Sequence, residues 1–186
     1  MHFNYIFRFC PVCGAGLKST VLKENEPPRL LCEACEFVFY LDPKLVACAL
    51  VEMNNKVVLL KRASSPEKGK WVVPGGYVDR GEEVRAAALR ETKEECGIHI
   101  RINGLLGVYS YAGWLEVVIV YLSEYVSGDL VAADESMEVG LWSPEEIPWQ
   151  NLAFRSTRDA LMDYCRVKNR PVSTPSRIDG NHILKP

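Results

Sequence analysis

The sequence predicts an α/β domain preceded by a small metal-binding module. Between residues 43 and 167, short apolar runs typical of strands alternate with two longer segments of helical pattern. The first 42 residues hold four cysteines in two C-x-x-C pairs, namely Cys10, Cys13, Cys32 and Cys35. The chain of 186 residues is long enough for one sizeable core and a small module. Residues 168–186 are polar and contain three prolines, which predicts a loosely ordered tail.

The cysteine pairs predict a zinc ribbon over residues 1–42. Eighteen residues separate Cys13 from Cys32, which is within the usual range for a four-cysteine zinc site. Four thiolates hold Zn²⁺ tetrahedrally, and a module of about 40 residues is too short to be stable through core burial alone. We therefore expect structural zinc to contribute much of its stability. Two disulfides or a redox-active C-x-x-C are the alternatives, although the βαβ pattern of a redox motif is missing around the pairs.

The strands of the larger domain are predicted from apolar runs and turn residues. Lys44 to Glu52 has the composition of a buried strand, and Asn54-Asn55 then turns the chain into a second strand, which predicts a hairpin. A loop rich in turn and charged residues follows at 64–70. The strands that we expect are residues 44–52, 56–61, 70–73, 100–110 and 115–125.

Helices are predicted at three places. The first begins near Glu82 and ends at Gly97, because glycine suits the left-handed position just past a helix. Ser143 and Pro144 have the pattern of a helix start, although Pro148 ends that helix early. Residues 156–167 have the apolar spacing of an amphipathic helix. The two longer helices, alternating with the strands, are the basis of the α/β class.

Composition excludes several classes of partner. A formal net charge of −2 implies no general attraction to nucleic acid or to an anionic membrane. No apolar run reaches the length of a transmembrane helix, and the apolar start is too short for a signal peptide. Seven cysteines, an odd number, favour a reducing compartment, so we expect a cytoplasmic protein. The three cysteines outside the quartet are predicted to be buried thiols, namely Cys48, Cys96 and Cys165.

The most informative motif runs from Gly76 to Ile98 and has the pattern G-x5-E-x7-R-E-T-x-E-E-x-G-I. Glu91, Glu94 and Glu95 fall at i, i+3 and i+4, so on a helix they share one arc of roughly 100°. Like charges at this spacing repel one another, which indicates that a cation binds there. Mg²⁺ and similar hard cations prefer oxygen ligands and bridge to phosphates. A solvated, charged helix face is the alternative.

Residues around the acidic helix support the cation site. Gly75 and Gly76 end a strand-like run and allow the backbone to approach a ligand closely. Arg90 is placed to pair with Glu94 one turn on and to reach Glu82 or Glu83, which would hold the carboxylates in position.

The motif resembles the Nudix box of the Nudix hydrolases, and it matches all seven fixed Gly, Glu and Arg positions. Thr92 departs from the aliphatic residue that is usual in the family. The resemblance implies an α/β/α sandwich around a mixed sheet and Mg²⁺- or Mn²⁺-dependent hydrolysis of a nucleoside diphosphate linked to another group. It implies that Glu91 and Glu95 are the main metal ligands. Further implied ligands are Glu82, Glu94 and a carbonyl of Gly75 or Gly76.

The resemblance leaves the general base and the substrate contacts open. The base is a box glutamate or an acid of the segment Asp134–Glu138, where Glu135 and Glu138 are the candidates, and Glu116 is a weaker one. With Arg90 and the box glutamates, these two acids complete the predicted catalytic set. Solvated loop acids are the alternative. Trp71 and Tyr77 are the aromatic candidates for stacking on a nucleotide ring, although strand aromatics belong more often to the core.

Two Nudix groups share the predicted ribbon. NADH pyrophosphatases resemble the chain, but their Ser-Gln-Pro-Trp-Pro-Phe-Pro-type segment is missing here. The short group that includes plant FAD and ADP-ribose pyrophosphatases matches better, at Phe9–Gly14, Asp42–Lys44, Trp71–Tyr77 and Asn151–Phe154. We therefore expect ADP-ribose or FAD to be cleaved with release of AMP, the alternatives being NADH or a non-catalytic nucleotide sensor. The ribbon has no basic patch, so nucleic acid is not the expected partner, and a homodimer is left open.

Overall fold

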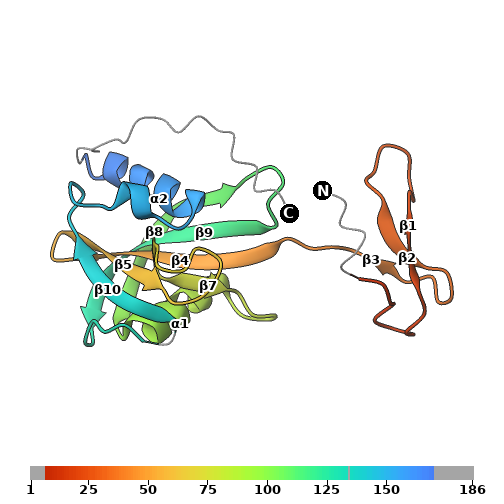
Figure 1. Cartoon of the computed structure of the whole chain (residues 1–186), viewed down its shortest axis with the longest axis horizontal. Helices are drawn as coiled ribbons and strands as arrows, with labels where there is room; N and C mark the ends of the chain where they lie inside the picture. Colours follow the sequence, from red (N-terminus) through yellow and green to blue (C-terminus); the bar gives the residue numbers. More distant parts are fainter. Residues whose placement is uncertain (1–6, 134, 170–186) are drawn as a thin grey trace. The chain divides into compact units, whose positions relative to one another are not determined.

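The computed structural model describes residues 7–133 and 135–169. The chain divides into two compact units, Met1–Pro43 and Lys44–Pro186, and Figure 1 shows the elements of each. Most of the predicted tail, from residue 170 onward, and the predicted loop acid Asp134 lie outside the described residues.

The first unit is a small three-stranded antiparallel sheet. Its strands are β1 (Leu17–Thr20), β2 (Arg29–Cys32) and β3 (Val38–Phe39), in the order β1-β2-β3. Leu30, Cys10 and Cys32 are its buried apolar residues among those described. Because so few side chains are buried, the unit depends on an additional source of stability, as the sequence suggested.

The second unit contains a mixed sheet of seven strands. These are β4 (Lys44–Met53), β5 (Lys56–Arg62), β6 (Trp71–Val72), β7 (Gly75–Tyr77), β8 (His99–Ser110), β9 (Glu116–Ser127) and β10 (Ser136–Trp142). The main order is β10-β5-β4-β9-β8, with β6 beside β5 and β7 beside β4. Among the paired strands of the described residues, β4 and β9 are parallel and the other pairs are antiparallel. The predicted hairpin of β4 and β5 is confirmed, and Asn54 and Asn55 turn it with φ of 54° and 61°.

Two helices cover opposite faces of this sheet (Figure 1). Helix α1 (Val84–Cys96) packs Ala87 and Ala88 against Ala47 of β4. Helix α2 (Arg155–Val167) packs against the next residue of that strand, Cys48, because successive side chains of a strand point to opposite faces. The predicted α/β/α arrangement is confirmed. Neither helix combines the length and the apolar character that crossing a membrane requires, nor does any other helix of the described residues.

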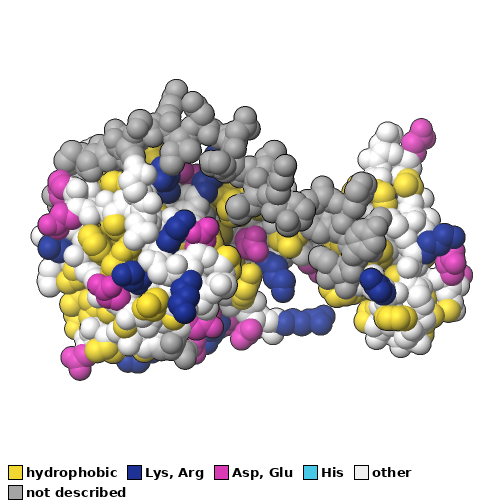
Figure 2. All heavy atoms as spheres, in the orientation of Figure 1, with side chains coloured by type: hydrophobic (Ala, Val, Ile, Leu, Met, Phe, Trp, Pro, Cys, Tyr) yellow, Lys and Arg dark blue, Asp and Glu magenta, His cyan; other side chains and the backbone are white. Residues whose placement is uncertain are grey.

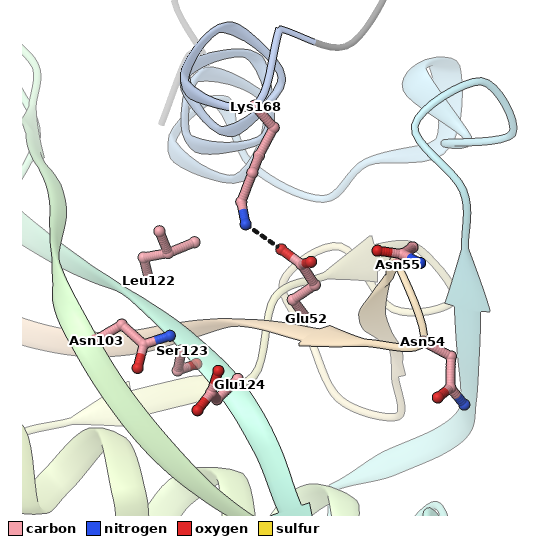
Figure 3. A pocket seen from close by; sticks show the side chains of 8 residues that line it. All are labelled: Glu52, Asn54, Asn55, Asn103, Leu122, Ser123, Glu124 and Lys168. Carbon is pink, nitrogen blue, oxygen red and sulfur yellow. Dashed lines mark ion pairs between the residues drawn. The ribbon is translucent and has the colours of Figure 1, made fainter.

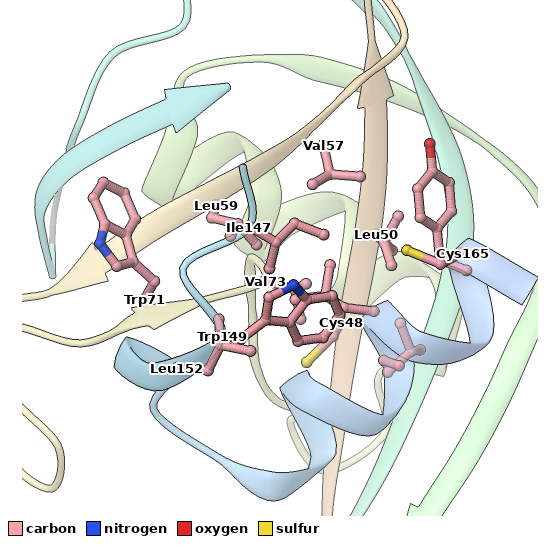
Figure 4. Packing of buried hydrophobic residues seen from close by; sticks show 14 of the residues in the cluster. Cys48, Leu50, Val57, Leu59, Trp71, Val73, Ile147, Trp149, Leu152 and Cys165 are labelled. Atoms are coloured by element: carbon pink, nitrogen blue, oxygen red, sulfur yellow. The ribbon is translucent and has the colours of Figure 1, made fainter. Parts of the chain in front are cut away.

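The core lies mainly between the sheet and α2. Figure 4 shows Cys48 and Leu50 of β4 meeting side chains from α2 and from the segment that precedes it. The predicted burial of the three isolated thiols is confirmed, because Cys48, Cys96 and Cys165 are 5%, 0% and 0% exposed. Charged side chains stay outside, and acidic and basic groups are interspersed on the face of this unit seen in Figure 2.

After β9 the structure contains one strand that the sequence did not predict and one helix that it predicted wrongly. Residues 136–142 form β10, because they extend the sheet beside β5, where Glu138 pairs with Lys61. The helix expected at Ser143 is a single turn closed by a 2.9 Å hydrogen bond from the Glu146 N–H to the Ser143 carbonyl. Pro148 lacks an N–H and disfavours helical backbone in the residue before it, so the turn ends there. A short 3₁₀ helix, η1 (Trp149–Asn151), follows.

Candidate active site

The residues of the box and the glycine before it form a strand, a loop and a helix. Strand β7 pairs with β4, with Gly76 opposite Ala47, and α1 follows after a short loop. The helix ends at Gly97, whose φ of 73° and N–H bond to the Lys93 carbonyl confirm the predicted left-handed cap. This geometry brings the acidic side of α1 against β7.

Glycine is required where β7 meets α1. A Cβ atom on Gly76 would lie 2.4 to 2.6 Å from the carboxylate atoms of Glu91. At Gly75 a Cβ atom would lie 2.5 Å from the Ala47 carbonyl oxygen. The group that the Gly76 backbone approaches is therefore a box carboxylate, and the predicted approach of the two glycines to a ligand stays a prediction.

One guanidinium holds three of the box carboxylates together. Arg90 donates through Nε and Nη2 to the two oxygens of Glu82, both at 2.8 Å. Its Nη1 donates to Glu91 at 2.7 Å and to Glu94 at 3.1 Å. Nη2 also donates to the Tyr77 carbonyl at 3.2 Å. The expected contacts of Arg90 with Glu82 and Glu94 are present, and the hydrogen bonds from Arg90 and from the Asp79 N–H lower the pKa of Glu82 to about 2.

Glu95 occupies a different environment beside the same cluster. Its Oε2 accepts a 2.8 Å hydrogen bond from the Gly75 N–H. Burial nevertheless raises the pKa of Glu95 to about 7, and the nearby charge of Glu91 adds to the shift. Burial also raises the pKa of Glu91, against the opposing effect of Arg90. Two carboxylates thus lie side by side with too little positive charge around them, and carboxylate oxygens are the donors that Mg²⁺ and Mn²⁺ prefer.

The two predicted base candidates lie in different places. Glu135 is close enough to Glu95 for its charge to raise that pKa, and its Oε2 accepts a 3.4 Å hydrogen bond from Ser64 Oγ. Its backbone is tied to the same loop, since the Ala63 N–H donates to the Glu135 carbonyl at 2.8 Å. Glu138 lies on β10 and forms an ion pair with Lys61 at 3.2 Å.

The two aromatic candidates also lie in different environments, one buried and one exposed. Trp71 is only 6% exposed and packs edge-on against Trp142 in the core, at 5.0 Å between ring centroids. The structure therefore corrects the prediction that Trp71 contacts the substrate, because both faces of the sheet are covered at β6 and the ring packs into the core cluster. Tyr77 follows Gly76 and is 53% exposed, so its ring is open to a ligand.

Arg62, at the end of β5, was missed by the sequence reasoning. Its positive charge lowers the pKa of both Glu95 and Tyr77, so it borders the same space. Nε donates to the Pro66 carbonyl at 2.9 Å, and the guanidinium lies 5.0 Å from the centre of the Phe154 ring. Within the described residues it forms no ion pair with a carboxylate. A basic residue at the end of a strand is a weak signal in a sequence, and only the fold brings it to the box.

The four cysteines of the first unit meet in one cluster. Their Sγ atoms all lie within 4.8 Å of one another, with 3.6 Å between Cys10 and Cys35 and 3.5 Å between Cys13 and Cys32. Zinc–sulfur bonds of about 2.3 Å give a tetrahedron with edges of about 3.8 Å, so the set fits Zn²⁺. All four thiols are free, which is against the disulfide alternative. Burial raises the pKa of Cys32, but N–H groups of Cys35 and Ala34 outweigh it and bring the pKa down to about 7.

A separate hollow of about 300 Å³ lies at the other end of the sheet (Figure 3). It is crossed by the ion pair of Lys168 and Glu52, at 2.7 Å. None of its lining residues belongs to the box or to the cysteine cluster: they are Glu52, Asn54, Asn55, Asn103, Leu122, Ser123, Glu124 and Lys168. We therefore assign no part of the hydrolytic site to it.

Comparison with protein families agrees with this geometry. Residues 42–164 match the family model described as NUDIX domain, and residues 8–41 match the one described as Nudix N-terminal, a zinc ribbon. The chain belongs to the Nudix hydrolase family and carries its N-terminal zinc ribbon. It is accordingly a Nudix-type pyrophosphatase.

Individual relatives give the same picture. The chain is 35% identical over 139 residues to an ADP-ribose pyrophosphatase from Methanocaldococcus jannaschii, a match that covers 72% of this chain and 80% of the relative. It is 28% identical over 130 residues to the NAD-capped RNA hydrolase NudC from Vibrio parahaemolyticus, covering 69% of this chain but only 48% of NudC. The chain thus spans about half the length of that relative. A crystal structure of a Nudix hydrolase from Nitrosomonas europaea superimposes with a TM-score of 0.82 at 33% identity, covering 89% of this chain and 96% of that one.

Proposed function

We propose that this pyrophosphatase hydrolyses ADP-ribose to AMP and ribose 5-phosphate, with Mg²⁺ or Mn²⁺ as the cofactor. The observation that carries the proposal is the ordered carboxylate cluster of α1, held by Arg90 against Gly76. The 35% identity to an ADP-ribose pyrophosphatase favours this substrate, and FAD is the second candidate. Both contain an adenosine diphosphate, so they offer the same scissile linkage.

Four glutamates are the proposed metal ligands. Glu91 and Glu95 would hold the cation most directly, because burial raises the pKa of both carboxyls and a bound cation would offset the cost of their buried charge. Glu94 and Glu82 complete the set, and Arg90 keeps both in place through its hydrogen bonds. A bound Mg²⁺ or Mn²⁺ supplies Lewis-acid neutralisation of the diphosphate charge. A backbone carbonyl of Gly75 or Gly76 is the further proposed ligand.

Arg62 is the proposed anchor for a substrate phosphate. Its guanidinium borders the carboxylates without an acidic partner in the described part of the chain, and its Nε is held by Pro66. Guanidinium groups bind phosphate oxygens through two parallel hydrogen bonds. With one phosphate held by Arg62, the diphosphate would lie next to the carboxylates that would hold the cation.

Glu135 is the proposed general base. It lies close to Glu95 and is oriented by Ser64, whereas Glu138 is engaged with Lys61. In the proposed step, Glu135 accepts a proton from a water molecule while the oxygen of that water attacks one phosphorus of the diphosphate. The bond from that phosphorus to the bridging oxygen breaks, and the second phosphate leaves with the electron pair.

Product analysis by chromatography tests the proposal. The zinc-loaded protein with Mg²⁺ is incubated separately with ADP-ribose, FAD, NADH, NAD⁺, an NAD-capped RNA and a nucleoside triphosphate. We expect AMP with ribose 5-phosphate from ADP-ribose, at the highest kcat/KM of the panel. AMP from NADH or from the capped RNA alone would move the enzyme to the alternative substrates. Binding without cleavage would make it a nucleotide sensor, a role that the complete set of box carboxylates argues against.

A further inference from the structure

The segment from Asn151 to Phe154 joins η1 to α2 and brings one aromatic residue to the end of β5. The Ala153 N–H donates to the Trp71 carbonyl of β6 at 2.8 Å. Phe154 is the N-cap residue of α2, with extended backbone (φ −128°, ψ 153°), and its carbonyl accepts from the Arg158 N–H at 3.2 Å. A strand on one side and a helix on the other therefore fix the backbone of Phe154.

The Phe154 ring lies against the guanidinium of Arg62. The ring is partly buried and packs against the core cluster that includes Val58 and Leu60 of β5. Arg62 follows Leu60 by two residues and so belongs to the same face of the strand. Its Cζ atom lies over the Phe154 ring, 5.0 Å from the centroid, which is a cation–π distance. The ring is thus a fixed surface for the arginine side chain.

Further contacts restrain Arg62 without using its terminal N–H groups. Its backbone N–H donates to the Lys70 carbonyl at 3.0 Å, and its carbonyl accepts from the Gly69 N–H at 2.8 Å. Nε donates to the Pro66 carbonyl at 2.9 Å. Within residues 7–133 and 135–169, Nη1 and Nη2 have no hydrogen-bond or ion-pair partner. The guanidinium is held in place, and its terminal N–H groups remain available to a ligand.

The neighbouring basic residue of β5 is arranged differently. Lys61 also lies beside a ring, with Nζ 5.6 Å from the centroid of Trp71, but it forms an ion pair with Glu138 at 3.2 Å. A carboxylate accepts the N–H groups of a cation, whereas a phenyl ring attracts the cation and has no acceptor atom. Phe154 therefore holds Arg62 and leaves its N–H groups to an anion.

We propose that Phe154 is a positioning residue, whose ring holds the Arg62 guanidinium in the orientation that binds a substrate phosphate. The charge of Arg62 reaches the box, since it lowers the pKa of Glu95. An arginine that is already held loses less conformational entropy when a phosphate binds than a free one does. The inference rests on the proposed function for the role of Arg62 and for the identity of the substrate.

Binding of ADP tests the inference, because ADP carries the diphosphate of the proposed substrate. Dissociation constants are measured by calorimetry with Mg²⁺ for the wild-type protein, for Phe154→Leu, Phe154→Tyr and Arg62→Ala, and for Phe154→Leu combined with Arg62→Ala. We expect Arg62→Ala to weaken ADP binding about tenfold or more and Phe154→Leu to weaken it about fivefold. Phe154→Tyr keeps a ring and should stay near the wild-type value. The double variant should bind no more weakly than Arg62→Ala alone, because Phe154 acts through Arg62.

Tyr121→Leu is the matched control, since it removes a ring beside another arginine, Arg85, whose Cζ lies 5.9 Å from the ring centroid. Its ADP affinity should equal that of the wild-type protein. Thermal melting records whether each variant is folded. Phe154→Met keeps an apolar side chain of similar length and replaces Phe154→Leu if the latter does not fold.

Three results would overturn the inference alone: an unchanged ADP affinity in Phe154→Leu, equal losses in Phe154→Leu and Phe154→Tyr, or a full additional loss in the double variant. An unchanged affinity in Arg62→Ala, or no ADP binding by the wild-type protein, would overturn it together with the proposed phosphate anchor. Hydrolysis of ADP-ribose by the wild-type protein is recorded in parallel. ADP binding that depends on both residues, without any hydrolysis, would refute only the proposed function.

Discussion

At the scale of the residue, the site is a balance between one arginine and several carboxylates. Arg90 neutralises Glu82 most completely and reaches Glu91 and Glu94 as well. Glu95 receives only a backbone N–H, from Gly75. Charge is thus compensated on one side of the cluster and left uncompensated on the other, which is the side where we propose that the cation binds.

Glu95→Gln should lower kcat by about 100-fold or more, because an amide oxygen carries no charge for a divalent cation. The protein should remain folded, since the amide keeps the size of the side chain. Steady-state rates with ADP-ribose and thermal melting provide the two measurements. Glu83→Gln, an exposed position at the start of the same helix, is the control and should leave both unchanged. A near-normal rate in Glu95→Gln would remove the metal assignment.

The raised pKa of Glu95 makes the stability of the metal-free protein depend on pH. In the folded protein the pKa of Glu95 is about 7, whereas in the unfolded chain the pKa of a glutamate is about 4.3. Protonation therefore favours the folded state, and this contribution is complete below about pH 4.3 and is lost as pH rises through about 7. With a chelator present, the melting temperature of the wild-type protein should fall relative to Glu95→Gln over this window. Excess Mg²⁺ should reduce the difference, and parallel curves in chelator would contradict the assignment.

At the scale of the element, the site depends on how closely β7 and α1 approach. The contact is made by Gly76, which has room for a hydrogen but not for a methyl group beside Glu91. Neither element alone creates the site, because the carboxylate of the helix touches the backbone of the strand. The spacing of the box residues preserves this contact.

Gly76→Ala should therefore impair catalysis more than stability. The added Cβ would lie 2.4 Å from the Glu91 carboxyl carbon, so the carboxylate has to move. Displacement of about 1 Å at a catalytic group costs about 100-fold in rate. Kinetics and thermal melting measure the two effects, and Gly104→Ala, where the added atom meets nothing within 4 Å, is the matched control. Equal kinetics for the two variants would show that the close approach does not matter.

We expect the stability of the zinc ribbon to depend on its metal. We expect about one tightly held zinc per chain, and Cys32→Ser should lose it, because a hydroxyl is a poor zinc ligand. Metal analysis by mass spectrometry gives the stoichiometry, and hydrogen exchange over residues 8–41 reports whether β1 to β3 persist. Cys165→Ser is the control, since this thiol lies in the core of the other unit. A zinc-free wild-type protein with an ordered ribbon would contradict the prediction.

At the scale of the whole molecule, the fold collects groups that are distant in the sequence. The box supplies the carboxylates, the end of β5 supplies Arg62, and the segment before β10 supplies Glu135. Lys44 of β4 lies with its Nζ 5.5 Å from the centroid of the Tyr77 ring of β7. The cytoplasmic location expected from the sequence stays a prediction, and the homodimer stays open.

The two late acids should behave differently, because the sheet places only one of them beside the box. We expect Glu135→Gln to lower kcat by about 100-fold, within the range for a lost general base, and Glu138→Gln to change it little. Steady-state kinetics of the two variants with ADP-ribose measure the difference. If both variants were silent, the base would be one of the box glutamates.

The local features of this protein were determined by its sequence. Helix α1, its Gly97 cap, the Asn54-Asn55 hairpin and the paired cysteines all depend on residues a few positions apart, whose spacing sets the contact directly. The Nudix box belongs with them, because its carboxylates share one helix.

Other features were decided only by the tertiary structure. Four of them depend on contacts between distant segments: the burial of Trp71, the pairing of β10 with β5, the position of Arg62 beside the box, and the separation of Glu135 from Glu138. A strand at the edge of a sheet forms when a neighbour offers unpaired backbone groups, and that neighbour is dozens of residues away. The spacing of residues within one segment does not indicate such distant partners, so the complete set of site residues is brought together only once the sheet has been assembled.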